Sequence, residues 1–220
     1  MDQYYVENNQ WGAGYVPHTQ TVETVPNFAW EFDYPDDPVE ANGVLAYPAI
    51  VHGWKPWAEM GTDSVLPCVI PESYNLNVNY NMKTEVKPGC RYNTAFDLWI
   101  TSKKGGREAD ITHEVMFWVA SKGDNRPAGR QLGTILGCHY YHATQNNSFW
   151  NMPWECISII LPLSFGANEY PHSVNLGQYL AELVNMSLLP AENFVASIEF
   201  GNEIWGGKGR TTVFEYKVTL

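Results

Sequence analysis

The chain is built largely of short runs in which apolar and polar residues alternate, separated by turn-forming residues. The runs are rich in Val, Ile, Thr, Tyr, Phe and Trp, which favour strands, and the alternation is that of a strand with one face in a core. Gly, Pro, Asn and Asp between the runs mark turns. The pattern predicts strands at 74–86, 92–100, 114–120, 156–163, 195–205 and 211–219.

One segment, residues 174–189, has a different periodicity. Its apolar residues lie on a single stripe at helical spacing, namely Leu176, Leu180, Leu183, Val184 and Leu188. Ser173 or Asn175 can cap the start of this helix, and Pro190 ends it. Many short strands and one helix predict an all-β fold: a β-sandwich jelly roll of two packed antiparallel sheets, in one domain over residues 1–220.

Composition excludes some functions. The formal net charge of −11 leaves no basic face for a nucleic acid or for an anionic membrane surface. No apolar run reaches the length of a membrane-spanning helix. Nine Trp, thirteen Tyr and nine Phe exceed what a core requires, so we expect some rings to line a surface that binds something flat and apolar.

The four cysteines leave two possibilities open. An even number permits two disulfides, most locally Cys68 with Cys90 and Cys138 with Cys156, and acidic, aromatic, Asn-rich domains are commonly secreted. The alternative is four buried thiols in a cytosolic protein. We expect a secreted, disulfide-bonded protein, although the first residues do not resemble a signal peptide. The absence of a C-x-x-C motif argues against zinc or redox chemistry.

Three predicted strands each place a carboxylate beside a tryptophan on the face opposite to the core. The pairs that share a face are Asp97 with Trp99, Glu114 with Trp118, and Glu203 with Trp205. On one strand a solvated outer face would explain the acid, but the threefold arrangement favours a concave substrate cleft. Indoles stack on sugar rings and paired carboxylates act on glycosidic bonds, so this face indicates a sugar-binding cleft. Glu199 is interpreted as peripheral, because roughly 13 Å of strand separate it from Glu203.

Several motifs, taken together with their order and spacing along the chain, resemble glycoside hydrolase family 12, the compact β-jelly-roll endoglucanases. Residues 114–119 (EVMFWV) are similar to the nucleophile strand of that family, and residues 95–99 (AFDLW) to the strand with an assisting Asp. Residues 201–207 (GNEIWGG) resemble the segment with the acid/base Glu. The remaining motifs are 8–12 (NNQWG) near the N-terminus, 46–50 (AYPAI), 53–57 (GWKPW) and the Pro-containing loop 123–129 (GDNRPAG).

This resemblance implies a retaining endo-β-1,4-glucanase, a cellulase that cleaves cellulose or related β-glucans by double displacement. Glu114 would be the nucleophile, Glu203 the general acid/base, and Asp97 a hydrogen-bonded partner that assists the nucleophile. An acidic pH optimum follows as an expectation. The implied partner is a β-glucan polysaccharide, with no metal, no cofactor, no nucleic acid and no membrane, and the enzyme is expected to be a monomer. The implied substrate-binding residues are Asn9, Trp11, Trp54, Met116, Trp118, Pro127 and Trp205.

Two alternative functions stay open. One is a xyloglucan-specific endoglucanase, and the other is a non-catalytic, lectin-like jelly roll that binds carbohydrate on the same face. Residues 138–154 are less like the family, which leaves specificity on the leaving-group side undefined. For Trp11 the alternative is core packing, and for Met116 it is filling a core gap.

Overall fold

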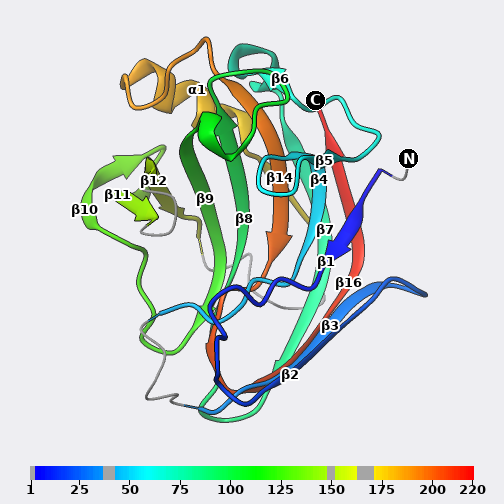
Figure 1. The fold of residues 1–220 in the computed structure, drawn as a ribbon. Coiled ribbons are helices and arrows are strands. Elements are labelled where there is room, and N and C mark those ends of the chain that lie inside the picture. The colour runs from blue at the N-terminus through cyan, green and yellow to red at the C-terminus, as the bar shows by residue number, and fades with distance from the viewer. Residues whose placement is uncertain (1–2, 37–42, 148–151, 163–170) are drawn as a thin grey trace.

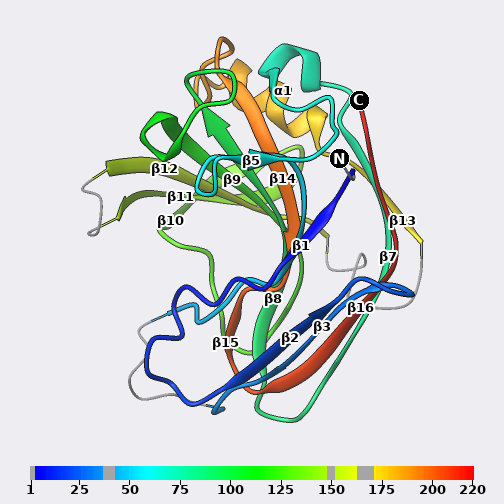
Figure 2. The ribbon, with the colours of Figure 1, turned by 45° about the vertical axis from the view of Figure 1, so that its right-hand side comes forward.

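The computed structural model of the protein describes residues 3–36, 43–147, 152–162 and 171–220. Its strands form two packed sheets, which confirms the predicted all-β sandwich of the jelly-roll type (Figures 1 and 2). Among the described residues, no helix is long and apolar enough to cross a membrane.

The larger sheet has the strand order β1-β4-β14-β8-β9-β12-β11-β10, and the short strands β5, β6 and β15 pair with β4, β14 and β8. These strands are β1 (Tyr5–Glu7), β4 (Ala49–Lys55), β5 (Met60–Gly61), β6 (Cys68–Val69), β8 (Arg91–Thr101), β9 (Ile111–Lys122), β10 (Arg130–Ile135), β11 (Cys138–Asn147), β12 (Met152–Ile160), β14 (Phe194–Gly201) and β15 (Ile204–Gly206).

The prediction of purely antiparallel sheets is wrong at one pair, because β9 and β12 run parallel. After β9 the chain forms the β10–β11 hairpin and then returns as β12 beside β9, in the same direction. Parallel neighbours need such a crossover connection, because a tight turn can join only antiparallel strands. Residues 148–151 of the atypical stretch 138–154 lie outside the described residues.

The smaller sheet has the order β13-β7-β16-β3-β2 and covers one face of the larger sheet (Figure 2). Its strands are β2 (Thr19–Glu23), β3 (Phe28–Asp33), β7 (Asn77–Val86), β13 (His172–Asn175) and β16 (Lys208–Thr219). Two short 3₁₀ helices, η1 (Ile70–Ser73) and η2 (Glu108–Asp110), lie in connections.

The single predicted helix is confirmed but is shorter than expected. Helix α1 spans Gly177–Asn185, and the residues before it form β13. Of the two candidate caps, Asn175 is used, because its Oδ1 accepts a hydrogen bond from the Gln178 N–H at 3.0 Å. Ser187 adopts a positive φ of 58°, which ends the helix before Pro190 is reached.

The core between the sheets contains the residues that the alternation placed there. Phe96, Leu98 and Ile100 of β8 are fully buried, as are Val115 and Phe117 of β9. The other face of β8 and β9 carries two smaller apolar clusters, which include Trp99 and Trp118. The larger sheet therefore presents a second, aromatic surface outside the sandwich, on the side of the predicted acids.

The predicted disulfides are wrong, because all four cysteines are free and buried. Cys156 lies opposite Ala143 on β11, five residues or about 17 Å along the strand from Cys138. Cys68 and Ile100 both pair with Val195 of β14, one on each side of it. Cys90 precedes the first residue of β8 and lies ten residues before Ile100, so it is at the opposite end of that strand from Cys68. A disulfide requires Cα atoms within about 7 Å, so neither local pair can form one.

Candidate active site

Four carboxyl groups come together on the outer face of the larger sheet. Asp97 lies on β8, Glu114 on β9, Glu199 on β14 and Glu203 in the turn between β14 and β15. The charges of the three glutamates all raise the pKa of Asp97, after the larger effect of its burial. Asp97 and Glu199 are 4% and 1% exposed, whereas Glu114 and Glu203 are only partly buried. Only the last two are open to a ligand.

The interpretation of Glu199 as peripheral is wrong. Glu199 is far from Glu203 along β14, but it lies directly opposite Asp97 in the pairing of β14 with β8. Lys55 of β4 also reaches Glu199 Oε2 at 2.9 Å. Glu199 is therefore a member of the carboxyl cluster.

Glu114 is held by β12, the parallel neighbour of β9. The Trp154 indole Nε1 donates a hydrogen bond to Glu114 Oε2 at 2.8 Å, and Cys156 lies opposite Glu114 in the strand register. Burial raises the pKa of Glu114 to about 6, while hydrogen bonds from the Trp154 indole and the Cys156 thiol oppose that rise. Glu114 is thus an ionised carboxylate at neutral pH.

Glu203 is held by Asn93 at the start of β8. The Glu203 backbone N–H donates to Asn93 Oδ1 at 3.1 Å, and Asn93 Nδ2 donates to Glu203 Oε2. Burial and then the charge of Glu114 raise the pKa of Glu203 to about 8, against the hydrogen bond from Asn93. At neutral pH, Glu203 therefore carries a proton while Glu114 is charged.

The turn that carries Glu203 is anchored by Asn202, which is fully buried. Asn202 Oδ1 accepts hydrogen bonds from Trp30 Nε1 and the Thr211 hydroxyl, both at 2.7 Å. Its Nδ2 donates to the Asn93 carbonyl at 2.9 Å and to Thr94 Oγ1 at 2.8 Å. The side chain thereby ties the turn to both sheets and to the strand that holds Glu203.

Aromatic rings flank the cluster on both sides. Trp57, Trp99 and Trp154 meet edge to face, with ring centroids 5.2–6.0 Å apart. On the other side, Trp118 and Trp205 lie 6.0 Å apart. This part of the predicted arrangement, acids beside indoles on one face, is present in the structure.

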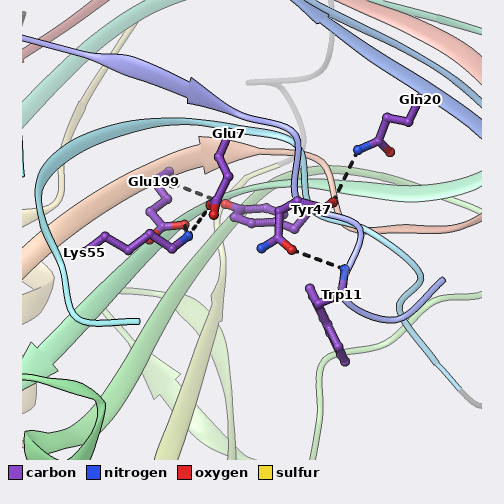
Figure 3. Close-up of polar contacts among 7 residues, drawn as sticks. Glu7, Trp11, Gln20, Tyr47, Lys55 and Glu199 are labelled. Carbon is purple, nitrogen blue, oxygen red and sulfur yellow. Dashed lines mark hydrogen bonds and ion pairs between the residues drawn. The ribbon is translucent and has the colours of Figure 1, made fainter. Parts of the chain in front are cut away.

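The predicted N-terminal binding residues lie on the loop after β1. Trp11 is 69% exposed, so the alternative of core packing is wrong for it. Asn9 Oδ1 accepts from the Trp11 backbone N–H at 3.2 Å, and the Asn9 carbonyl accepts from the Tyr47 N–H. Figure 3 shows the Trp11 ring extending from this loop.

The other predicted binding residues differ in their surroundings. Met116 packs with Trp118 and Ala95 on the outer face, 5% exposed. Trp54 belongs to the aromatic cluster of Trp99, and its Nε1 donates to the Gly106 carbonyl at 2.8 Å. Pro127 lies in a loop that Asn125 ties to the Tyr92 carbonyl, on the Glu203 side, without a described contact to the acids.

Three residues of the site were missed at the level of sequence: Trp154, Asn93 and Lys55. Asn93 alternates in step with Asp97 on β8, a signal that could have placed it on the same face. Trp154 lies in the atypical stretch, where no motif indicated a role. Lys55 could be found only through its partners on other strands. Among the described residues, no group of three or more His, Cys, Asp or Glu side chains is arranged to hold a metal ion.

Replacing Trp154 with Phe should lower kcat by about 10-fold or more and move the acidic limb of the pH profile to higher pH. The change keeps a ring against Trp57 and Trp99 but removes the donor to Glu114, and a hydrogen bond to a charged group contributes about 1.5–3 kcal/mol. Losing a donor that favours the carboxylate raises the pKa of Glu114. Rates measured across pH check this. Trp57→Phe is the matched control, and equal profiles for both variants would contradict the role of Trp154.

Fold and site together define a class: a jelly-roll protein whose aromatic face carries two accessible carboxyl groups of unequal acidity, an arrangement suited to acid–base work on a glycosidic bond. A scan against models of known families gives no match. The chain is 27% identical over 235 residues to endoglucanase S of Pectobacterium parmentieri, covering all of this chain and 82% of that protein.

Solved structures with the same fold are also glycoside hydrolases of family 12. A family 12 xyloglucanase from Bacillus licheniformis is 25% identical, with a TM-score of 0.83 over 99% of this chain and 92% of that one. An endoglucanase from Rhodothermus marinus shares the fold, with 22% identity and a TM-score of 0.72 over 99% and 91% of the two chains. The predicted resemblance is confirmed: the chain is related in sequence and fold to the glycoside hydrolases of family 12.

Proposed function

We propose that the protein is a retaining endo-β-1,4-glucanase that cleaves β-glucans by double displacement. The observation that carries this proposal is the pair of partly exposed carboxyl groups on one aromatic face, with Glu114 held by the Trp154 indole and Glu203 by the Asn93 amide. Their surroundings raise the pKa of Glu114 to about 6 and that of Glu203 to about 8. A nucleophile must be ionised and a general acid protonated at the same pH, and the surroundings of these two residues favour that combination.

In the proposed reaction, Glu114 attacks the anomeric carbon while Glu203 gives its proton to the departing glycosidic oxygen. A glycosyl–enzyme ester forms and the aglycone leaves. Glu203, now ionised, takes a proton from water, whose oxygen attacks the anomeric carbon and releases Glu114. Two inversions give net retention, and this route requires the carboxyl groups to lie about 5–5.5 Å apart. Asp97 is proposed to assist Glu114 through the electrostatic interaction between the two carboxyl groups.

The substrate-binding roles follow the aromatic surface. Trp11, Trp118 and Trp205 are proposed to stack on or border successive sugar rings, with Met116 between them. Asn9 supplies a hydroxyl partner, and Trp54 and Pro127 bound the two ends of the site. We further propose that residues 1–220 act as one monomeric catalytic domain, and outside the cell, because an intact polysaccharide does not cross a membrane.

Reducing-sugar release from carboxymethyl-cellulose, mixed-linkage β-glucan, xyloglucan and xylan tests the proposal. Hydrolysis of the first two is expected, and the anomeric proton signal of the first product should be that of the β form. An initial α product would contradict the retaining mechanism. No product from any of the four would favour a lectin-like protein.

A second candidate, a xyloglucan-specific endoglucanase, is favoured by one observation. The two structures named xyloglucanases superpose with TM-scores of 0.83, against 0.72 for the Rhodothermus marinus endoglucanase. Release of sugar from xyloglucan, with little from linear or mixed-linkage glucan, would decide for this candidate.

The pH dependence of kcat/KM should be bell-shaped, with an acidic limb near 6 and a basic limb near 8. Activity is lost below the pKa of Glu114, about 6, because the nucleophile becomes protonated, and above the pKa of Glu203, about 8, because the acid loses its proton. The expected optimum thus moves from acidic to near neutral. Initial rates at subsaturating substrate across pH measure it, and a rate still rising beyond the basic limb would rule out Glu203 as the acid.

A further inference from the structure

Lys55, Glu7 and Glu199 form an ion triad that shares Glu199 with the carboxyl cluster, and Lys55 and Glu7 have no part in the proposed reaction. Lys55 of β4 contacts Glu199 Oε2 of β14 at 2.9 Å and also Glu7 Oε2 of β1. Figure 3 shows the Lys55 ammonium between the two carboxylates. Burial alone would lower the pKa of Lys55, but Glu199 and Glu7 outweigh it and raise that pKa. Lys55 is therefore a permanent positive charge inside the protein.

Glu199 and Asp97 are direct neighbours across the β14–β8 pair, which brings their Cβ atoms to about 4.5–5.5 Å. Each leaves one oxygen buried without a hydrogen-bond partner, Asp97 Oδ1 and Glu199 Oε1. Two buried carboxylates this close cannot both be ionised at modest cost. One proton between them would satisfy both orphan oxygens.

The surroundings decide which acid carries that proton. The titratable and charged groups around the pair are Tyr5 and Glu7 of β1, Tyr47, Lys55 of β4, Glu114 of β9, Cys156 of β12, Glu203 and Tyr216 of β16. Lys55 is the one cation among these groups, and it contacts Glu199. The Tyr47 hydroxyl is occupied by the carbonyls of Ala95 and Glu199.

Asp97, in contrast, faces negative charge. Burial and the charges of Glu114, Glu199 and Glu203 all raise the pKa of Asp97. Lys55 lowers this pKa, but its effect is the smallest of the five. Burial raises the pKa of Glu199 too, but Lys55 is the largest influence that lowers it again. The Trp99 indole N–H also lowers the pKa of Glu199, although it does not reach hydrogen-bond geometry.

We propose that Asp97 and Glu199 share one proton, which stays on Asp97 because Lys55 keeps the negative charge on Glu199. The consequence for catalysis rests on the proposed function. A neutral Asp97 adds no second charge beside Glu114, so Glu114 can remain the ionised nucleophile. Lys55 and Glu199 act through Asp97 without touching the substrate, and are therefore positioning residues.

Three variants test the proposal through the acidic limb of kcat/KM. Asp97→Asn should leave the limb in place, because a neutral group replaces a neutral group. Glu199→Gln should move it up by about one pH unit, because Lys55 then draws the charge onto Asp97, nearer to Glu114. In the double variant neither carboxyl of the Asp97–Glu199 pair remains, so the limb should return to the wild-type position or below. A downward shift in Asp97→Asn, or no shift in Glu199→Gln, would overturn the proposal.

A second measurement needs no substrate. With ¹³C-labelled Asp carboxyl groups, the wild type should show one carbon that is still protonated above about pH 5, where ordinary Asp, with a pKa of about 3.9, is ionised. This signal should vanish in Asp97→Asn, titrate as a carboxylate in Glu199→Gln, and persist in the control Asp33→Asn, which alters an exposed pair with Lys208. If every Asp carbon is ionised, the proposal fails. If none of the polysaccharides is hydrolysed, the proposed function fails while this signal still reports the proton.

Discussion

Replacing Glu114 with Gly is expected to lower kcat on β-glucan by about 10⁴-fold or more, and azide should restore turnover with inverted stereochemistry. The substitution removes the group that attacks the anomeric carbon and leaves a space where its carboxylate lay. A small anion can enter that space and attack from the same side. With an aryl β-cello-oligosaccharide as substrate, the product should be the α-glycosyl azide, because only one inversion then takes place.

Glu203→Gly is the matched comparison, since the two carboxyl groups have different tasks. An aryl group needs little protonation to leave, so the ester to Glu114 should still form in this variant. Azide then replaces the water that Glu203 can no longer activate, and the product should be the β-glycosyl azide. Proton NMR of the two azides reads out the assignment directly. The same anomer from both variants, or full activity in either, would show that the roles are assigned wrongly.

Replacing Asn202 with Ala is expected to cost about 3 kcal/mol or more of the free energy of unfolding and to lower kcat as well. The substitution leaves the Trp30 indole N–H without its acceptor, and removes the donor to the Thr94 hydroxyl and the Asn93 carbonyl. The Thr211 hydroxyl loses Asn202 but keeps its contact with the Thr84 hydroxyl. A buried polar group left unpaired costs about 1–3 kcal/mol. Because Asn202 precedes Glu203, the turn that orients the acid loses its anchor at the same time.

Urea unfolding and steady-state kinetics on the same preparation separate the two effects. Asn185→Ala is the control, because Asn185 is exposed on α1 and its side-chain hydrogen bond to Glu182 is long at 3.4 Å. That variant should change neither stability nor rate appreciably. If Asn202→Ala lost stability but kept the wild-type kcat where it is folded, the turn would not depend on Asn202 for its catalytic geometry.

The period-two pattern was sufficient to assign strand faces. Phe96, Leu98 and Val115 are in the core, and Asp97 and Glu114 are on the other face, as predicted. The helix was recognised by its stripe, although its first turn is a strand. The disulfides were predicted only from the even number of cysteines and their spacing along the chain. The strand register rules them out, because it holds Cys68 far from Cys90 and Cys138 far from Cys156.

What the sequence determined by itself is therefore which side chains face the core, which face outward, and which motifs resemble a family. These properties are local, since alternation depends only on neighbours along one strand. Which outward-facing side chains meet was decided by the tertiary structure alone. Glu199 meets Asp97, Trp154 reaches Glu114 and Asn93 holds Glu203 through pairings of strands that lie up to about a hundred residues apart. Period two is compatible with many registers, so only the packed sheets select the one that brings these groups together.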